Sequence, residues 1–115
     1  MSASRVFIIQ RAQFYDKKRR GFVNKYDFSK AARFGELVFL LPPGNLCEDE
    51  IPKAVDLIKE RLGTFKASDY LLLVGDPVAI AIVGTIVAKT TEDINLLKWD
   101  RLEMDYKPLK IKIGD

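Results

Sequence analysis

The sequence predicts a small α/β protein with a single domain over residues 1–115, in which central parallel strands are flanked by helices and a C-terminal antiparallel β-hairpin follows. Three observations carry this prediction. Apolar runs at 6–9, 37–41 and 70–74 have the length of buried strands, helical patterns at 49–62 and 77–89 lie between or after them, and an alternating segment ends the chain. Strands that alternate with helices imply parallel pairing through crossover connections.

The N-terminal third contains a short strand at 6–9 and then a basic segment at about 10–26. Gly21 and the aromatic residues around it favour an exposed β-hairpin or a long loop. Asp27 or Ser29 can cap a short helix at 30–34, which Gly35 ends.

The middle of the chain supplies a strand at 36–41 and an amphipathic helix at 49–62. The unbroken LVFLL of the strand indicates burial on both faces, so we expect 37–41 and 70–74 to form the centre of the sheet. Pro52 stands in the first turn of the helix and Gly63 follows its end. One apolar face of the helix is formed by Ile51, Val55, Ile58 and Leu62.

The most apolar stretch, 69–89, predicts a buried strand, a turn and a helix. Gly75 permits an unusual backbone angle, Asp76 can cap the helix, and Pro77 suits its first position. The helix at 78–88 is apolar on all sides, which predicts little exposed surface. An aspartate and a proline well inside this stretch argue against a membrane span, and the N-terminus lacks the pattern of a signal peptide.

The C-terminal segments 94–99 and 106–113 predict two strands joined as an antiparallel hairpin. Leu109 and Ile111 alternate with lysines, and Pro108 lies near the start, which is typical of a one-sided edge strand. Trp99 shares a strand face with Leu97, so we expect it to belong to the core.

The composition excludes several chemistries. The chain has no histidine and one cysteine, which removes histidine general bases, an intramolecular disulfide and cysteine-based metal clusters. Cys47 has acidic neighbours, which make it a poor nucleophile. No glycine-rich phosphate loop is present. We therefore expect no catalysis, no cofactor and no metal site.

The charge is divided unevenly along the chain. Residues 1–35 hold nine Lys and Arg against two Asp, a net charge of +7, whereas residues 36–115 hold ten against fourteen, a net of −4. Cations bind phosphates and exposed aromatic rings stack on unpaired bases, so the basic segment is a candidate nucleic-acid site. The alternative is a solvated turn whose aromatic side chains face the core. The candidate binding residues are Arg11, Tyr15, Lys17, Lys18, Arg19, Arg20 and Lys25.

A second candidate lies at the carboxyl ends of the expected parallel strands, at 42–45 and 75–77, where open α/β sheets bind ligands. Asp76 could serve as a functional carboxylate there, or it could be only a helix cap. The sequence also leaves open a homo-oligomer, since a second copy could bury the apolar helix. Ala81, Gly84 and Ala88 would allow two such helices to approach closely.

The segments FSKAARFGELVFLLPPG, DYLLLVGDPVAIA and LLKWDR, with the strand at 106–113, resemble a family of small uncharacterised proteins of tailed phages, marine phages included. The family pattern has a strand that ends in Gln, as Gln10 does here, and then a variable loop at the position of the basic run. The resemblance implies a phage protein that acts in the bacterial cytoplasm or in the virion. It implies no activity and no site residues.

The sequence thus predicts a non-enzymatic phage accessory protein that binds DNA or RNA through its basic N-terminal hairpin. Two alternatives remain. One is a protein–protein interaction module, either a modulator of a host factor or a virion component. The other is a small nucleotide-binding protein that uses the strand ends near Asp76.

Overall fold

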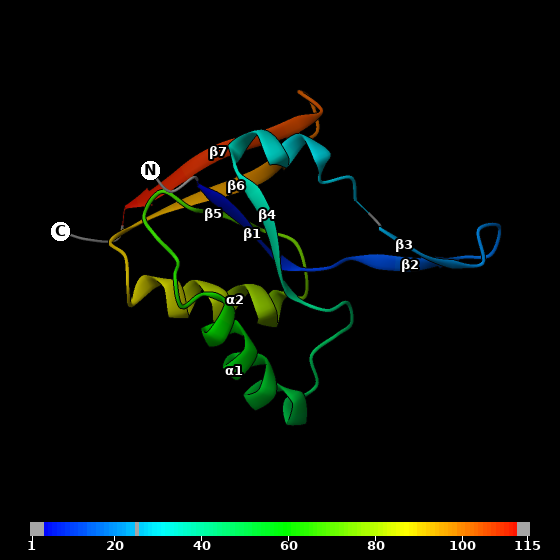
Figure 1. Cartoon of the computed structure of the whole chain (residues 1–115), viewed down its shortest axis with the longest axis horizontal. Helices are drawn as coiled ribbons and strands as arrows, with labels where there is room; N and C mark the ends of the chain where they lie inside the picture. Colours follow the sequence, from blue (N-terminus) through cyan, green and yellow to red (C-terminus); the bar gives the residue numbers. More distant parts are fainter. Residues whose placement is uncertain (1–3, 25, 113–115) are drawn as a thin grey trace.

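The fold is built on a five-stranded sheet, shown by a computed structural model that describes residues 4–24 and 26–112 (Figure 1). The spatial order of the strands is β4-β1-β5-β6-β7. The first four run parallel, and β7 pairs antiparallel with β6. The prediction of an α/β sheet with a C-terminal antiparallel pair is confirmed. The strands are β1 (Arg5–Gln10), β4 (Glu36–Leu41), β5 (Tyr70–Leu72), β6 (Asp93–Asp100) and β7 (Asp105–Lys112).

The two α-helices cover one face of this sheet, and a short 3-10 helix, η1 (Ser29–Phe34), lies on the other (Figure 1). Helices α1 (Ile51–Arg61) and α2 (Pro77–Ala88) pack on a core that includes Phe7, Ile9 and Leu71. A one-turn 3-10 helix, η2 (Glu48–Glu50), precedes α1. The opposite core is smaller and is closed by residues from η1 and β7. The second face is therefore the thinly covered one.

The expected central position of 37–41 is wrong, because β4 is an edge strand that pairs only with β1 among the described strands. Its LVFLL run is apolar because both faces of the strand contact helices or loops. Burial of the two faces does not determine whether a strand has hydrogen-bonded neighbours on both of its sides. Arg61 of α1 donates hydrogen bonds to the carbonyls of Phe39 and Leu40, each at 3.0 Å. This side chain occupies part of the backbone that another strand could otherwise pair with.

The start of α2 agrees with the prediction, but the exposure of the helix does not. Asp76 Oδ1 accepts a hydrogen bond of 2.8 Å from the Val78 N–H, as an N-cap does. Only one side of α2 is buried, at Ala79, Val83 and Val87, whereas Val78 and several small residues are exposed. The expected lack of exposed surface fails because α2 lies against a single sheet and has nothing over its outer side among the described residues.

The edge position of β7 is confirmed, yet the inner face of this strand is only half covered. Leu109 and Ile111 remain 43% and 44% exposed. Trp99 on β6 is 39% exposed, so its expected place in the core is wrong, while Leu97 is fully buried. The cover by η1 at the end of β6 is incomplete, and it leaves part of the Trp99 side chain exposed.

Candidate nucleic-acid interface

A two-stranded hairpin extends away from the sheet at the carboxyl end of β1 (Figure 1). Strands β2 (Gln13–Asp16) and β3 (Gly21–Asn24) pair antiparallel with each other and form a separate two-stranded sheet. We call residues 13–24 the basic arm. The expectation of an exposed β-hairpin is confirmed, and ligands of open α/β sheets bind at this same end of the strands.

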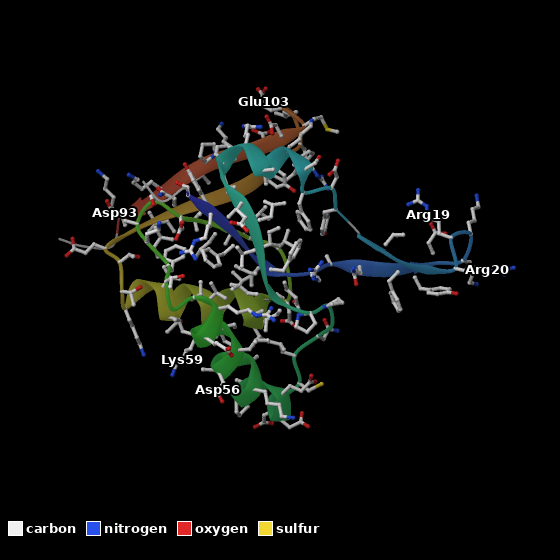
Figure 2. The ribbon with its side chains drawn as sticks, in the orientation of Figure 1. Arg19, Arg20, Asp56, Lys59, Asp93 and Glu103 are labelled. Atoms are coloured by element: carbon white, nitrogen blue, oxygen red, sulfur yellow. The ribbon has the colours of Figure 1, made fainter. Side chains whose placement is uncertain are left out.

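The tip of the basic arm is a four-residue turn that consists only of cations. Asp16 organises it, because its Oδ1 accepts hydrogen bonds from the backbone N–H groups of Lys18 (2.9 Å) and Arg19 (3.4 Å). Arg20 completes the turn with a positive φ of 53°. Figure 2 shows Arg19 and Arg20 at the far end of the arm, away from the body of the protein.

The turn at the other hairpin of the chain has the same construction. Asp100 Oδ1 accepts from the N–H groups of Leu102 (2.9 Å) and Glu103 (3.2 Å), and Met104 has a φ of 52°. The two turns differ in their side chains, since this one holds a single cation, Arg101. Turn geometry and tip charge are therefore independent in this protein.

Two aromatic side chains lie directly opposite each other on one face of the basic arm. Tyr15 and Phe22 form a cross-strand pair with ring centroids 5.6 Å apart in an edge-to-face arrangement. They are 55% and 70% exposed. For this pair the alternative in which the aromatic residues face the core is wrong. Adjacent exposed apolar side chains are a feature of interaction surfaces.

The structure brings together five of the seven residues predicted to bind nucleic acid. Arg11 lies at the root of the basic arm, where its guanidinium carbon is 3.9 Å from the centroid of the Phe39 ring and its N–H donates to the Leu41 carbonyl. Lys25 lies outside the described residues. The five that share the arm are Tyr15, Lys17, Lys18, Arg19 and Arg20.

Two other cations of the basic N-terminal third are paired with carboxylates of the body. Arg5 pairs with the fully buried Asp69 at 2.9 Å, and Arg33 pairs with Asp105 at 2.6 Å. The guanidinium of Arg33 lowers the pKa of Asp105, so this pair stays charged at neutral pH. The tip of the arm thus holds the longest run of cations in the first 35 residues, four in succession.

The strand ends near Asp76 form a network of hydrogen bonds centred on Gln10, which is 3% exposed. Gln10 Oε1 accepts from the Asp76 N–H at 2.7 Å, and its Nε2 donates to the carbonyls of Pro42 (3.0 Å) and Gly44. Asp76 Oδ2 accepts from the Leu46 N–H at 3.0 Å, while Oδ1 caps α2. Both oxygens of this carboxylate are engaged by the backbone, which favours the structural role over the ligand-binding one.

Gly75 is required beside this network. Its φ is +133°, and a Cβ at this position would lie 2.5 Å from Gln10 Cβ. A side chain there would collide with a buried neighbour and strain the backbone.

Cys47 is exposed just before η2. A hydrogen bond and the negative charge of Glu50 raise the pKa of the Cys47 thiol, which agrees with its interpretation as a poor nucleophile. Ala81 and Ala88 on α2 are exposed, and the space beside Gly84 is open. The sequence leaves open that a second copy packs on this outer side of α2.

Within residues 4–24 and 26–112, no helix combines the length and the apolar composition that crossing a membrane requires. The fold and the site define a small α/β protein with a projecting basic hairpin. The family model of the Phage Pam3 gp32-like proteins matches residues 4–113, and the chain belongs to this family. The resemblance to a family of phage proteins is thereby confirmed. No curated protein and no solved structure matches the chain.

Proposed function

We propose that this phage protein binds nucleic acid through its basic arm, as a non-enzymatic accessory protein in the cytoplasm of the infected bacterium. The observation that supports the proposal most is the tip of the arm. Four consecutive exposed cations stand on a projecting hairpin, beside an exposed pair of aromatic rings. Arg5 and Arg33 of the body are paired with carboxylates, so the tip of the arm offers phosphates the densest group of cations.

The charge of the tip sets the expected salt dependence. If each of the four cations neutralises one phosphate, the slope of log K against log salt is about −3 for a single strand and about −4 for a duplex. Affinity for a single strand then falls about 50-fold between about 50 mM and 200 mM salt. Contacts that are mostly apolar would give a much smaller change.

The aromatic pair predicts a preference for single strands. Tyr15 and Phe22 are open on one face of the arm, and stacking on an exposed ring is worth about 1–3 kcal/mol per base. Bases in a duplex are already stacked and are not available to these rings. We therefore expect single-stranded DNA or RNA to bind more tightly than a duplex of the same length.

The test is a fluorescence-anisotropy titration of labelled single- and double-stranded DNA and RNA at about 50 mM and 200 mM salt. One variant changes Lys17, Lys18, Arg19 and Arg20 to Gln. Its matched control changes four exposed lysines of the body, which removes the same charge elsewhere. The control lysines are Lys53, Lys59, Lys89 and Lys110.

The proposal expects the arm variant to lose binding and most of the salt slope, and the control variant to keep both. Equal losses in the two variants would mean that only net charge matters, which contradicts a site on the arm. Undetectable binding of every nucleic acid at low salt would also overturn it.

A protein partner is the second candidate, and the observation that favours it is the exposed Tyr15–Phe22 pair. Exposed aromatic anchors are frequent in protein interfaces. Such a partner, a host factor or a virion protein, predicts weak salt dependence and no preference for strand type. It would be indicated by loss of partner binding in Tyr15→Ala with Phe22→Ala, together with absent nucleic-acid binding.

A further inference from the structure

A groove of about 700 Å³ opens at the carboxyl ends of β5 and β6, on the face of the sheet that carries η1. The loop that follows the basic arm forms one wall, and the turn between β6 and β7 forms another. We call it the Trp99 groove. Its lining includes Tyr26, Lys30, Val74, Lys98, Trp99, Arg101, Met104 and Tyr106.

The indole of Trp99 is a flat apolar surface within this groove. It is held by Tyr106, whose ring packs edge-on against it with centroids 5.0 Å apart. Tyr106 is itself buried, and its hydroxyl donates to the Asp27 carbonyl at 3.2 Å. Burial raises the pKa of the Tyr106 phenol, so the hydroxyl remains a donor at neutral pH. Trp99 is therefore held in place by Tyr106, while the residue as a whole remains 39% exposed.

The described residues around this platform carry more positive than negative charge. Lys30, Lys98 and Arg101 line the groove, against one carboxylate, Asp27. The Lys30 Nζ lies 5.9 Å from the centroid of the Trp99 ring and donates to the Met104 carbonyl, which fixes this cation beside the indole. Asp27 accepts from the Ser29 N–H at 2.9 Å, and this bond lowers the pKa of its carboxyl. The Asp27 carboxylate thus binds the backbone of its own turn.

An aromatic platform with a cationic rim fits a flat ring that carries a phosphate. Stacking on aromatic rings is tolerant of base type, and nearby lysine or arginine neutralises the attached phosphate. A volume of about 700 Å³ is within the range of small-ligand sites. The strands β1, β5 and β6 run parallel, so the carboxyl ends of β5 and β6, where the groove lies, are at the same end of the sheet as the start of the basic arm, which Figure 1 shows extending from β1.

We propose that the Trp99 groove holds one unpaired base of a single strand whose phosphates are bound by the basic arm. This inference rests on the proposed nucleic-acid function and adds a second contact to it. The base stacks on the exposed part of Trp99, and the flanking phosphates face Lys30 and Arg101. A duplex offers no unpaired base and therefore leaves the groove empty.

The chain contains a single tryptophan, so Trp99 reports directly on its own groove. Titration with an unlabelled single strand, oligo(dT), is expected to quench its fluorescence with the same Kd that anisotropy gives. A duplex is expected to bind without this quenching.

Variants separate the groove from the arm. Trp99→Leu is expected to weaken single-strand binding about 5- to 150-fold in anisotropy and to leave duplex binding unchanged. Trp99→Phe keeps a ring and is expected to restore most of the affinity. Lys30→Gln with Arg101→Gln keeps the indole, and is expected to weaken binding while retaining a reporter for correct folding.

The outcomes of the two proposals are distinguishable. Oligo(dT) that binds through the arm, with unchanged Trp99 fluorescence and equal affinity in Trp99→Leu, would overturn the groove and leave the arm standing. Absence of binding to any nucleic acid in the unmodified protein would remove both. Equal quenching by the duplex would also contradict an unpaired base on the indole.

Discussion

The substitution Gln10→Glu tests the network that joins three loops at the carboxyl end of the sheet. The new carboxylate has the shape of the amide and can still accept from the Asp76 N–H. It cannot donate to the carbonyls of Pro42 and Gly44, and it places a negative charge against both oxygens. The variant thus preserves the packing and reverses the polarity of one atom.

The expected loss of stability follows from these contacts. Two missing hydrogen bonds cost about 2 kcal/mol at about 1 kcal/mol each. A carboxylate at a site where Gln10 is 3% exposed adds about 2–3 kcal/mol. The nearby Asp76 carboxylate opposes the new charge, while the exposed Lys53, which lines the same pocket, offsets part of it. We expect the free energy of unfolding to fall by about 4 kcal/mol at pH 8.

The loss depends on pH with a definite sign. Burial and the two carbonyls raise the pKa of the new carboxyl in the folded state above its value of about 4.3 in the unfolded chain. The folded state then binds the proton more tightly, so stability falls as pH rises above about 4.3. About 1–2 kcal/mol of the loss should be absent at pH 5, because the carboxyl of the unfolded chain is already mostly ionised at that pH and about 1 kcal/mol of the penalty has appeared.

Urea unfolding followed by circular dichroism at pH 5 and pH 8 measures both quantities. Gln10→Met is the matched control, because it removes three hydrogen bonds, costs about 3 kcal/mol and adds no titrating group. A Gln10→Glu variant that is as stable as the unmodified protein at pH 8, or that shows the same pH response as Gln10→Met, would refute the assigned network.

Three further predictions concern stability, each measured by urea unfolding. Asp69→Ala leaves the partly buried Arg5 guanidinium without its carboxylate and two backbone N–H groups without an acceptor, and it should cost about 3 kcal/mol. Asp105→Ala, at an exposed pair, should change little; similar losses would refute the distinction. Gly84→Ala should add about 0.5–1 kcal/mol, since the space beside this helical glycine is open, and destabilisation would mean that the site is occupied. Asp76→Ala should cost about 2 kcal/mol through loss of the acceptors for the Val78 and Leu46 N–H groups, and Asp76→Asn should restore about half of it, because its amide nitrogen cannot accept from Leu46; full rescue by Asn would contradict the Leu46 contact.

The junction between β5 and α2 could be predicted from the sequence because its determinants are local. The positive φ of Gly75, the cap from Asp76 to Val78 and Pro77 at the first helical position are local features, and the structure shows all three, whereas the contacts of Asp76 with Leu46 and of Gly75 with Gln10 are not local. Strand order is a different kind of property. β4 lies at the edge because β1 is inserted between β4 and β5. The amino-acid composition of β4 does not indicate which strands pair with it.

The candidate site also has features that local sequence predicts and features that depend on the rest of the fold. The cations of the tip are visible as a run in the sequence, and their exposure follows from the hairpin that they close. The direction of Tyr15 and Phe22 depends on the register of β2 against β3, because a shift by one residue would exchange the two faces. The prediction that Trp99 belongs to the core is wrong because its exposure depends on how much of β6 is covered by η1. The residues next to Trp99 in the sequence do not indicate the extent of that cover.

The two hairpin turns share one backbone construction, so the side chains at the tip of the arm can be exchanged without changing the turn. An aspartate at the first position and a left-handed residue at the fifth hold the backbone at both turns, so the residues between them carry little of the folding information. Mutation can therefore exchange tip side chains without disturbing the sheet. Grafting the turn sequence of 101–104 onto positions 17–20 would show this separation directly, as an intact fold with an altered charge at its tip.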